Sequence, residues 1–130
     1  MNKTNIIKDQ SRYIIPYENL KIGILGSGLM GHGIALSAAL NGNNVIMLDK
    51  SQKKAERGLH SIKYILNKGV KNGFYNIQES KRVLSKILPT SNYNNLKDCD
   101  LIIEAVFEDF ELKRRVIAEA EKIMKPQAIF

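Results

Sequence analysis

The 130-residue sequence predicts one α/β domain built on a doubly wound parallel sheet. Three observations carry this prediction. Short apolar runs alternate with longer amphipathic segments, which is typical of strands that alternate with helices. A glycine-rich turn joins the first apolar run to the first helical segment. A later run, 101–106, is apolar except for one acid, as expected of a parallel strand covered on both faces.

The composition is that of an ordinary globular protein, with 44% hydrophobic and 25% charged residues. Residues 1–19 are polar and lack the apolar centre of a secretory signal, so we expect a flexible leader before a domain that covers 20–130. No apolar stretch reaches the roughly 18 residues of a membrane span. The single Cys99 excludes an internal disulfide and suits a reducing compartment, so we expect a cytoplasmic protein.

The first half of the domain alternates strand and helix twice. The apolar run 22–25 is the first predicted strand. The good helix formers over 34–40 predict the first helix, which we expect to begin at about Met30. The run 45–48 is the second strand. Apolar residues then recur every three or four positions over 52–71, which predicts a long amphipathic helix.

The second half continues the pattern. We predict a helix over 78–86, a strand over 87–90, a turn over 92–96, a strand over 101–106, a helix over 112–124 and the start of a fifth strand at 128–130. The expected strand order 3-2-1-4-5 places a ligand crevice at the carboxyl ends of strands one and four. The sheet is expected to be incomplete at the C-terminus. Its last strand would form an uncovered edge, which favours self-association.

The residues from Ile22 to Gly33 read I-G-I-L-G-S-G-L-M-G-H-G and contain G-x-G-x-x-G at a strand-to-helix turn. In such a turn the first glycine permits the bend, the second lets a ligand approach the backbone, and the third lets the helix close onto the strand. The N–H groups and positive dipole end of the helix then face a pyrophosphate. We therefore predict a Rossmann-type dinucleotide-binding turn, with the binding residues Gly26, Ser27, Gly28, Leu29, Met30 and Gly31.

Asp49 follows the second strand and lies 21 residues after Gly28. This is the separation expected of a carboxylate that binds the adenosine ribose hydroxyls. A carboxylate there also repels a 2′-phosphate, so NAD is preferred over NADP, although Lys50 weakens that preference. The alternative is an Asp that caps a helix in an ordinary βαβ unit.

The net charge of +7 is concentrated between Lys50 and Lys86, where ten Lys and Arg face only Glu56 and Glu79. Three interpretations of this basic stretch remain open. The first is a solvated helix face, and the second is a surface for a phosphate-rich ligand such as a coenzyme A moiety. The third is nucleic-acid binding, which we do not expect because the stretch matches no DNA-binding module.

Two segments carry a resemblance to a known family. The segment G-S-G-L-M-G-H-G-I-A, the position of Asp49, and the segment D-L-I-I-E-A-V-F-E-D-F-E-L-K over 100–113 together resemble the NAD-binding domain of the 3-hydroxyacyl-CoA dehydrogenases. The V-F-E-D residues and the basic K-G-V-K-N-G segment look most like the multifunctional fatty-acid oxidation enzymes. The resemblance covers about 20–130.

The resemblance implies roles for further residues. The match of Asp49 binds the adenosine ribose, and Ala105 and Val106 line the nicotinamide-ribose side. Glu108 and Lys113 bind NAD near the reacting centre, although a solvated Glu108–Lys113 pair is the alternative from the residues alone. Two other residues are not assigned to catalysis. We expect Glu104 to be hydrogen-bonded near the crevice, and His32 to cap the turn or to face solvent.

The resemblance also implies a reaction, namely oxidation of an L-3-hydroxyacyl-CoA in fatty-acid β-oxidation with NAD as hydride acceptor. In that family the catalytic base and its orienting glutamate follow the fifth strand, so we assign no catalytic residue here, and we expect no metal site. The chain is expected to be truncated before the catalytic segment and inactive alone, with an acyl-CoA as the partner implied by the family. The alternative is a non-enzymatic, NAD-binding relic of a truncated gene.

Overall fold

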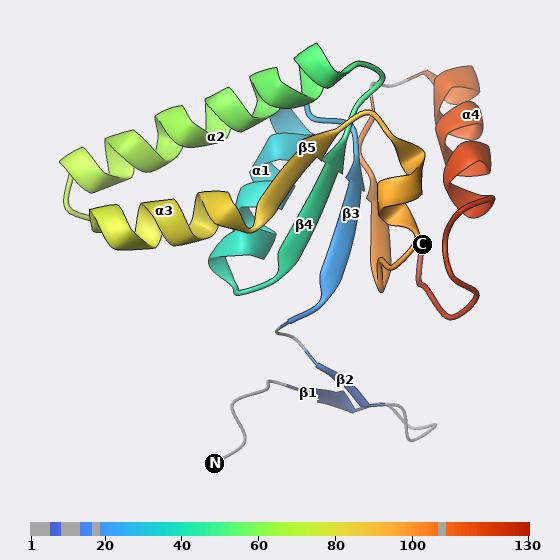
Figure 1. Cartoon of the computed structure of the whole chain (residues 1–130), viewed down its shortest axis with the longest axis horizontal. Helices are drawn as coiled ribbons and strands as arrows, with labels where there is room; N and C mark the ends of the chain where they lie inside the picture. The colour runs from blue at the N-terminus through green and yellow to red at the C-terminus, as the bar shows by residue number, and fades with distance from the viewer. Residues whose placement is uncertain (1–5, 9–13, 17–18, 107–108) are drawn as a thin grey trace.

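The computed structural model describes residues 6–8, 14–16, 19–106 and 109–130. Two short strands, β1 (Ile6–Lys8) and β2 (Ile14–Pro16), pair antiparallel in a small separate sheet. This pair was not predicted for the leader. It precedes the main body of the molecule, which begins at β3 (Lys21–Leu25) (Figure 1).

The main body is a parallel sheet with the strand order β5-β4-β3-β6. Its other strands are β4 (Asn44–Leu48), β5 (Ile87–Thr90) and β6 (Leu101–Glu104). The predicted order of the first four strands is therefore confirmed. The predicted fifth strand is reduced to one parallel bridge between Leu101 and Ile129, with the N–H of Ile102 donating to the carbonyl of Ile129 at 2.8 Å.

Helices cover both faces of the sheet, as a doubly wound fold requires (Figure 1). The helices α1 (Leu29–Leu40), α2 (Gln52–Lys71) and α3 (Ile77–Ser85) contribute to one apolar core, in which Ile24, Met47 and Ile62 are fully buried. The helix α4 (Phe110–Glu121) and the 3₁₀ turn η1 (Tyr93–Leu96) contribute to a second core around Leu25 and Ile102. The sheet therefore separates two cores and leaves its carboxyl edge open between them.

Local signals explain where most helices begin. Ser51 accepts a hydrogen bond from the N–H of Lys54 and caps α2, whereas Asn76 and Glu79 form a capping box at α3. Asp109 caps α4 by accepting from the N–H of Leu112 at 3.1 Å. The helix therefore begins at Phe110, directly after this cap, which is two residues before the predicted start at Leu112.

The strand β6 ends at Glu104, two residues before the predicted end at Val106. Its only neighbour on this side, β3, ends at Leu25, and Gly26 then turns away with a φ of 108°. The N–H of Ala105 still donates to the carbonyl of Leu25 at 2.8 Å. Among the described residues, the regular pairing of β6 with β3 ends at Leu25 and Glu104, so the strand stops there.

Candidate functional site

The glycine turn between β3 and α1 has the geometry that its spacing predicts. Gly26 adopts the left-handed φ of 108°, which L side chains rarely adopt. A Cβ on Gly31 would lie 1.9 Å from the carbonyl oxygen of Gly26, so only glycine lets α1 approach the strand this closely. A Cβ on Gly28 would meet no described atom within 4 Å. The fold therefore needs Gly26 and Gly31, whereas the space beside Gly28 is open toward the cleft.

No side chain caps the N-terminus of α1 within the described residues, in contrast to α2, α3 and α4. The first backbone N–H groups of a helix lack partners within the helix, and they form an anion site when no side chain occupies them. The uncapped turn and the open space at Gly28 together fit a bound pyrophosphate.

A cleft with a volume of about 1010 Å³ runs along the carboxyl ends of β4, β3 and β6. It brings together most of the residues that the sequence predicted for the site. The predicted residues on its wall are Gly26, Ser27, Gly28, Leu29, Met30, Asp49, Ala105, Val106 and Lys113. Gly31 lies behind the turn, packed against Gly26, and Glu108 lies outside the described residues.

Asp49 stands at the end of β4, beside the glycine turn, and accepts three hydrogen bonds. One carboxylate oxygen accepts from the N–H of Ser27 at 3.0 Å and from its hydroxyl at 2.6 Å, and the other accepts from the N–H of Lys50 at 2.7 Å. Burial alone would raise the pKa of Asp49, but these hydrogen bonds and the nearby Lys54 outweigh it and lower the pKa below 3.8. Asp49 is therefore ionised and fixed in orientation at neutral pH.

The predicted helix-capping alternative for Asp49 is wrong, because Ser51 is the cap of α2. The hydroxyl of Ser27 also lies 3.1 Å from the carbonyl oxygen of Lys54, so the same side chain contacts the first turns of α2. The turn, the end of β4 and the start of α2 are thus joined through Ser27. The sequence did not predict this contact.

His32 is buried, and its Nδ1 lies 3.3 Å from the carbonyl oxygen of Ser27. The expectation that it caps the turn is confirmed, whereas the alternative that it faces solvent is wrong. It lines a second, smaller pocket of about 350 Å³ between α1 and α2, which adjoins the main cleft at Ser27 and Asp49. Lys54 and Arg57 of α2 also line this pocket.

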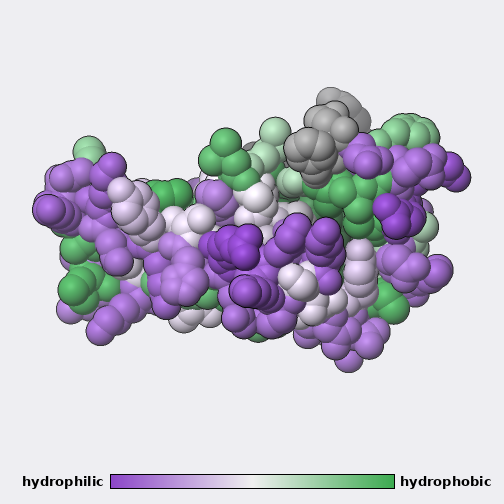
Figure 2. All heavy atoms as spheres, turned by 90° about the horizontal axis from the view of Figure 1, so that it is seen from above, coloured by the Kyte–Doolittle hydropathy of each residue, from purple (hydrophilic) through white to green (hydrophobic). Residues whose placement is uncertain are grey.

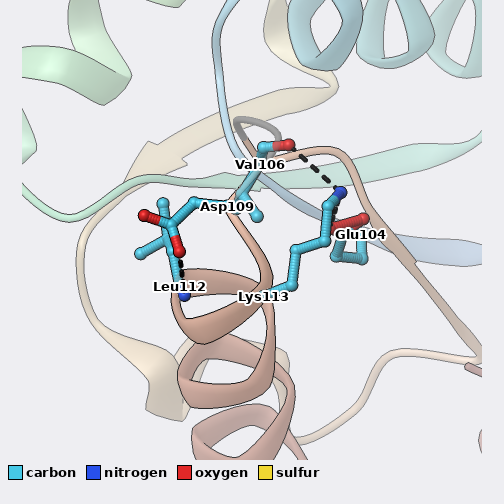
Figure 3. Close-up of polar contacts among 5 residues, drawn as sticks. All are labelled: Glu104, Val106, Asp109, Leu112 and Lys113. Carbon is cyan, nitrogen blue, oxygen red and sulfur yellow. Dashed lines mark hydrogen bonds and ion pairs between the residues drawn. The ribbon is translucent and has the colours of Figure 1, made fainter.

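The opposite wall of the cleft holds an ion pair (Figure 3). The ammonium of Lys113, in the first turn of α4, donates to Glu104 at the end of β6 at 2.5 Å. It also lies 3.4 Å from the carbonyl oxygen of Val106. The expectation that Glu104 is hydrogen-bonded near the crevice is confirmed. The alternative pairing of Lys113 with Glu108 stays a prediction, because Glu108 lies outside the described residues.

Three further features of the cleft were not predicted. Tyr93 of η1 lies on the wall, where burial, and then the negative charges of Glu119 and Asp49, raise the pKa of its hydroxyl. Leu112 and Val116 of α4 line the same wall. These residues could have been found from the topology, since η1 and α4 follow strands whose carboxyl ends lie at this edge.

Seen from the edge where the parallel strands end, the surface is mostly hydrophilic, with apolar patches on part of it (Figure 2). Leu29 and Met30, at the mouth of the cleft, are 87% and 68% exposed, and Phe110 at the start of α4 is 74% exposed. Among the helices of the described residues, none combines the length and the apolar character that crossing a bilayer requires.

An uncapped glycine turn beside a fixed carboxylate, at the carboxyl edge of a doubly wound sheet, defines a dinucleotide-binding domain of the Rossmann type. The family model described as "3-hydroxyacyl-CoA dehydrogenase, NAD binding domain" matches residues 21–130, so the chain belongs to this family and its cofactor is NAD.

Similar proteins agree with this assignment. The chain is 38% identical over 109 residues to the fatty acid oxidation complex subunit alpha of Colwellia psychrerythraea, covering 84% of this chain and 15% of that protein. It is 36% identical to a 3-hydroxybutyryl-CoA dehydrogenase of Bradyrhizobium diazoefficiens, over 84% of this chain and 37% of that protein. The crystal structure of the (S)-3-hydroxybutyryl-CoA dehydrogenase of Ralstonia eutropha superimposes with a TM-score of 0.82 at 29% identity, covering 86% of this chain and 40% of that one. The chain thus spans well under half the length of each of these relatives.

Proposed function

We propose that this chain binds NAD along the cleft and is the NAD-binding portion of an L-3-hydroxyacyl-CoA dehydrogenase of fatty-acid β-oxidation. The observation that carries the proposal is the arrangement of the cleft. An ionised carboxylate, Asp49, and a cation, Lys113, lie on opposite walls, with the open glycine turn between them. The groups of a dinucleotide follow in the same order, with a hydroxyl-bearing ribose at one end, a diphosphate in the middle and a second nucleoside at the other end.

Each part of the cofactor has a matching group. Asp49 would accept hydrogen bonds from the adenosine ribose hydroxyls, and the backbone N–H groups at Leu29 and Met30 would donate to the pyrophosphate. Ala105, Val106 and Lys113 would line the nicotinamide-ribose side, with Glu108 as a proposed further contact. When bound, NAD supplies a hydride acceptor.

The family relationship supports an acyl-CoA as substrate, because the relatives are named for 3-hydroxyacyl-CoA chemistry or fatty acid oxidation. No catalytic residue is proposed among the described residues. The carboxylates of Asp49 and Glu104 are both engaged in hydrogen bonds, and Cys99 is buried with a pKa raised to about 11 by burial. We therefore propose that the chain does not oxidise a hydroxyacyl-CoA unaided. We also propose a cytoplasmic location and no function in nucleic-acid binding.

The test is a titration of the purified chain with NADH, followed by its fluorescence. Saturable binding that is lost in Gly28→Val, with the Gly33→Ala variant as a control that binds normally, is the expected result. Gly33 is the appropriate control because a Cβ there also meets no described atom within 4 Å. Absence of saturable binding by the unmodified chain would refute the proposal.

A second experiment separates an enzyme portion from a non-enzymatic NAD-binding relic. The chain is mixed with NADH and acetoacetyl-CoA, with and without the remaining dehydrogenase segment of a relative. Oxidation of NADH only in the mixture is expected. Binding of NADH without turnover in either sample would instead identify the relic.

A further inference from the structure

Glu104 is a carboxylate at the end of β6, a strand with an otherwise apolar sequence. Its side chain is 18% exposed and that of its partner Lys113 is 27% exposed. The other ion pairs that α4 contributes lie far more in solvent, since Glu111 and Arg114 are 71% and 66% exposed. Taking a carboxylate out of water costs free energy that a nearby cation must offset. An apolar residue at this position of the sheet would pack without that cost. The stability of the fold therefore does not explain why a carboxylate is present here.

The fold does not depend on this pair to attach α4. Ala120 is fully buried in the second core, and Val116 and Met124 pack against that core. The Glu104–Lys113 pair lies instead on the wall of the cleft. The two side chains extend toward one another from the end of β6 and the start of α4 (Figure 3). The ion pair therefore determines where the ammonium of Lys113 lies on the cleft wall.

We propose that Glu104 is a positioning residue for cofactor binding, which fixes the ammonium of Lys113 at the β6 side of the cleft. The ammonium ends a four-carbon side chain with several rotatable bonds, and ordering such a side chain upon binding costs conformational entropy. The bonds from Lys113 to Glu104 and to the carbonyl of Val106 order it before any ligand arrives. A ligand that contacts Lys113 then meets an ordered group.

The proposal rests on the binding of NAD along the cleft, and it predicts which half of the cofactor is affected. Asp49 lies at the β4 end of the cleft and Glu104 at the β6 end, with the glycine turn of β3 between them. ADP reaches from Asp49 to the turn and contains no second nucleoside. Loss of the Glu104 charge should therefore weaken the binding of NADH and leave the binding of ADP unchanged.

The experiment measures the Kd of NADH and of ADP by calorimetry for the full 130-residue chain and for Glu104→Gln. We expect a Kd for NADH that is about five- to tenfold higher, corresponding to the ordering of one long side chain, and a Kd for ADP within twofold of the unmodified chain. The matched control is Glu111→Gln, which removes the same charge from α4 but lies in an exposed pair with Arg114. It should change neither Kd. The variant Glu104→Asp keeps the charge on a shorter side chain and should give an intermediate value.

A double-mutant cycle with Lys113→Met tests whether Glu104 acts through Lys113. If it does, the double variant binds NADH no more weakly than Lys113→Met alone. If the factors by which the two single substitutions raise the Kd for NADH multiply in the double variant, the proposal is overturned. It is also overturned if Glu104→Gln leaves the Kd for NADH unchanged, or if it weakens the binding of ADP as much as the binding of NADH. Binding of neither ligand by the unmodified chain would instead refute the proposed function. The retained affinity for ADP shows that a variant is folded.

Discussion

Three glycine-to-alanine substitutions around the start of α1 should have three different outcomes. The substitution Gly31→Ala places a Cβ 1.9 Å from the carbonyl oxygen of Gly26, whereas ordinary contact begins near 3.4 Å. The carbonyl would have to move by about 1.5 Å, away from a position fixed by the N–H of Gly26, which donates to Leu48 at 2.7 Å. Overpacking of this kind costs up to about 3 kcal/mol, and the higher helix propensity of alanine returns about 1 kcal/mol.

The net loss for Gly31→Ala is therefore about 2 kcal/mol of unfolding free energy, or a Tm lower by roughly 10 °C for a domain of this size. Gly28→Ala has a different effect, because its backbone φ of −71° suits any residue and its Cβ meets no described atom. It should change the unfolding free energy by less than about 1 kcal/mol, which is the range of an N-cap substitution. It should nevertheless weaken the binding of NADH at least tenfold. Gly33→Ala, inside α1 and in open space, should raise stability by about 0.5–1 kcal/mol and leave NADH binding intact.

Thermal unfolding followed by circular dichroism measures the first effect, and fluorescence titration with NADH measures the second. The two measurements should give different results for the two variants: Gly31→Ala should lower Tm, and Gly28→Ala should raise the Kd for NADH. A Gly31→Ala variant as stable as the unmodified chain would refute the packing argument. A Gly28→Ala variant that binds NADH normally would refute the assignment of the open turn to the pyrophosphate.

Three further predictions concern other parts of the chain. Because the folded protein lowers the pKa of Asp49, the contribution of this carboxylate to the unfolding free energy should be fully present above its usual pKa of 3.8 and should be lost as the pH falls below that value. Urea unfolding between pH 2.5 and 6 should therefore show a smaller decrease in stability for Asp49→Asn than for the unmodified chain. Cys99 is buried and its pKa is raised to about 11, so Ellman's reagent at pH 8 should label it only at the rate of unfolding, and fast labelling of the folded chain would contradict this. Ile129 and Phe130 are 52% and 43% exposed beside β6, so the chain should self-associate at micromolar concentration. Sedimentation should show that Ile129→Lys is monomeric. A monomeric unmodified chain would contradict this prediction.

The sheet and the turn could be predicted because each depends on residues close together in the sequence. Apolar runs locate the strands, the connections between them limit the order, and the three glycines are spaced for one turn. The position of Asp49 follows from the same logic, because a residue directly after a parallel strand must lie at the carboxyl edge. These predictions are confirmed by the β5-β4-β3-β6 order and by the shared cleft.

The contacts between side chains could not be predicted in the same way. Glu104 was expected to be hydrogen-bonded near the crevice, but its partner Lys113, nine residues later, was not predicted. This contact depends on how α4 packs beside the end of β6, which the spacing of the two residues in the sequence does not determine. His32 shows the same limit, since it is buried and lines a pocket together with Arg57 and Gly58 of α2, a helix that begins 20 residues later in the sequence.

The two ends of the cleft differ in how their charged groups are fixed, and this difference has a functional consequence. At the β4 end, Asp49 is fixed by the backbone and hydroxyl of Ser27, which belongs to the glycine turn itself. The proposed ribose and pyrophosphate sites are therefore joined by hydrogen bonds between Ser27 and Asp49. At the β6 end, the described contacts of the Lys113 ammonium, to the carboxylate of Glu104 and to the carbonyl oxygen of Val106, are made by the flexible side chain of Lys113. Because a lysine side chain is flexible, substitutions at the β6 end should change the geometry of the nicotinamide half while the adenosine half stays in place. If the proposed sites are right, substitutions at the β6 end should therefore change the affinity for NADH without changing the affinity for ADP.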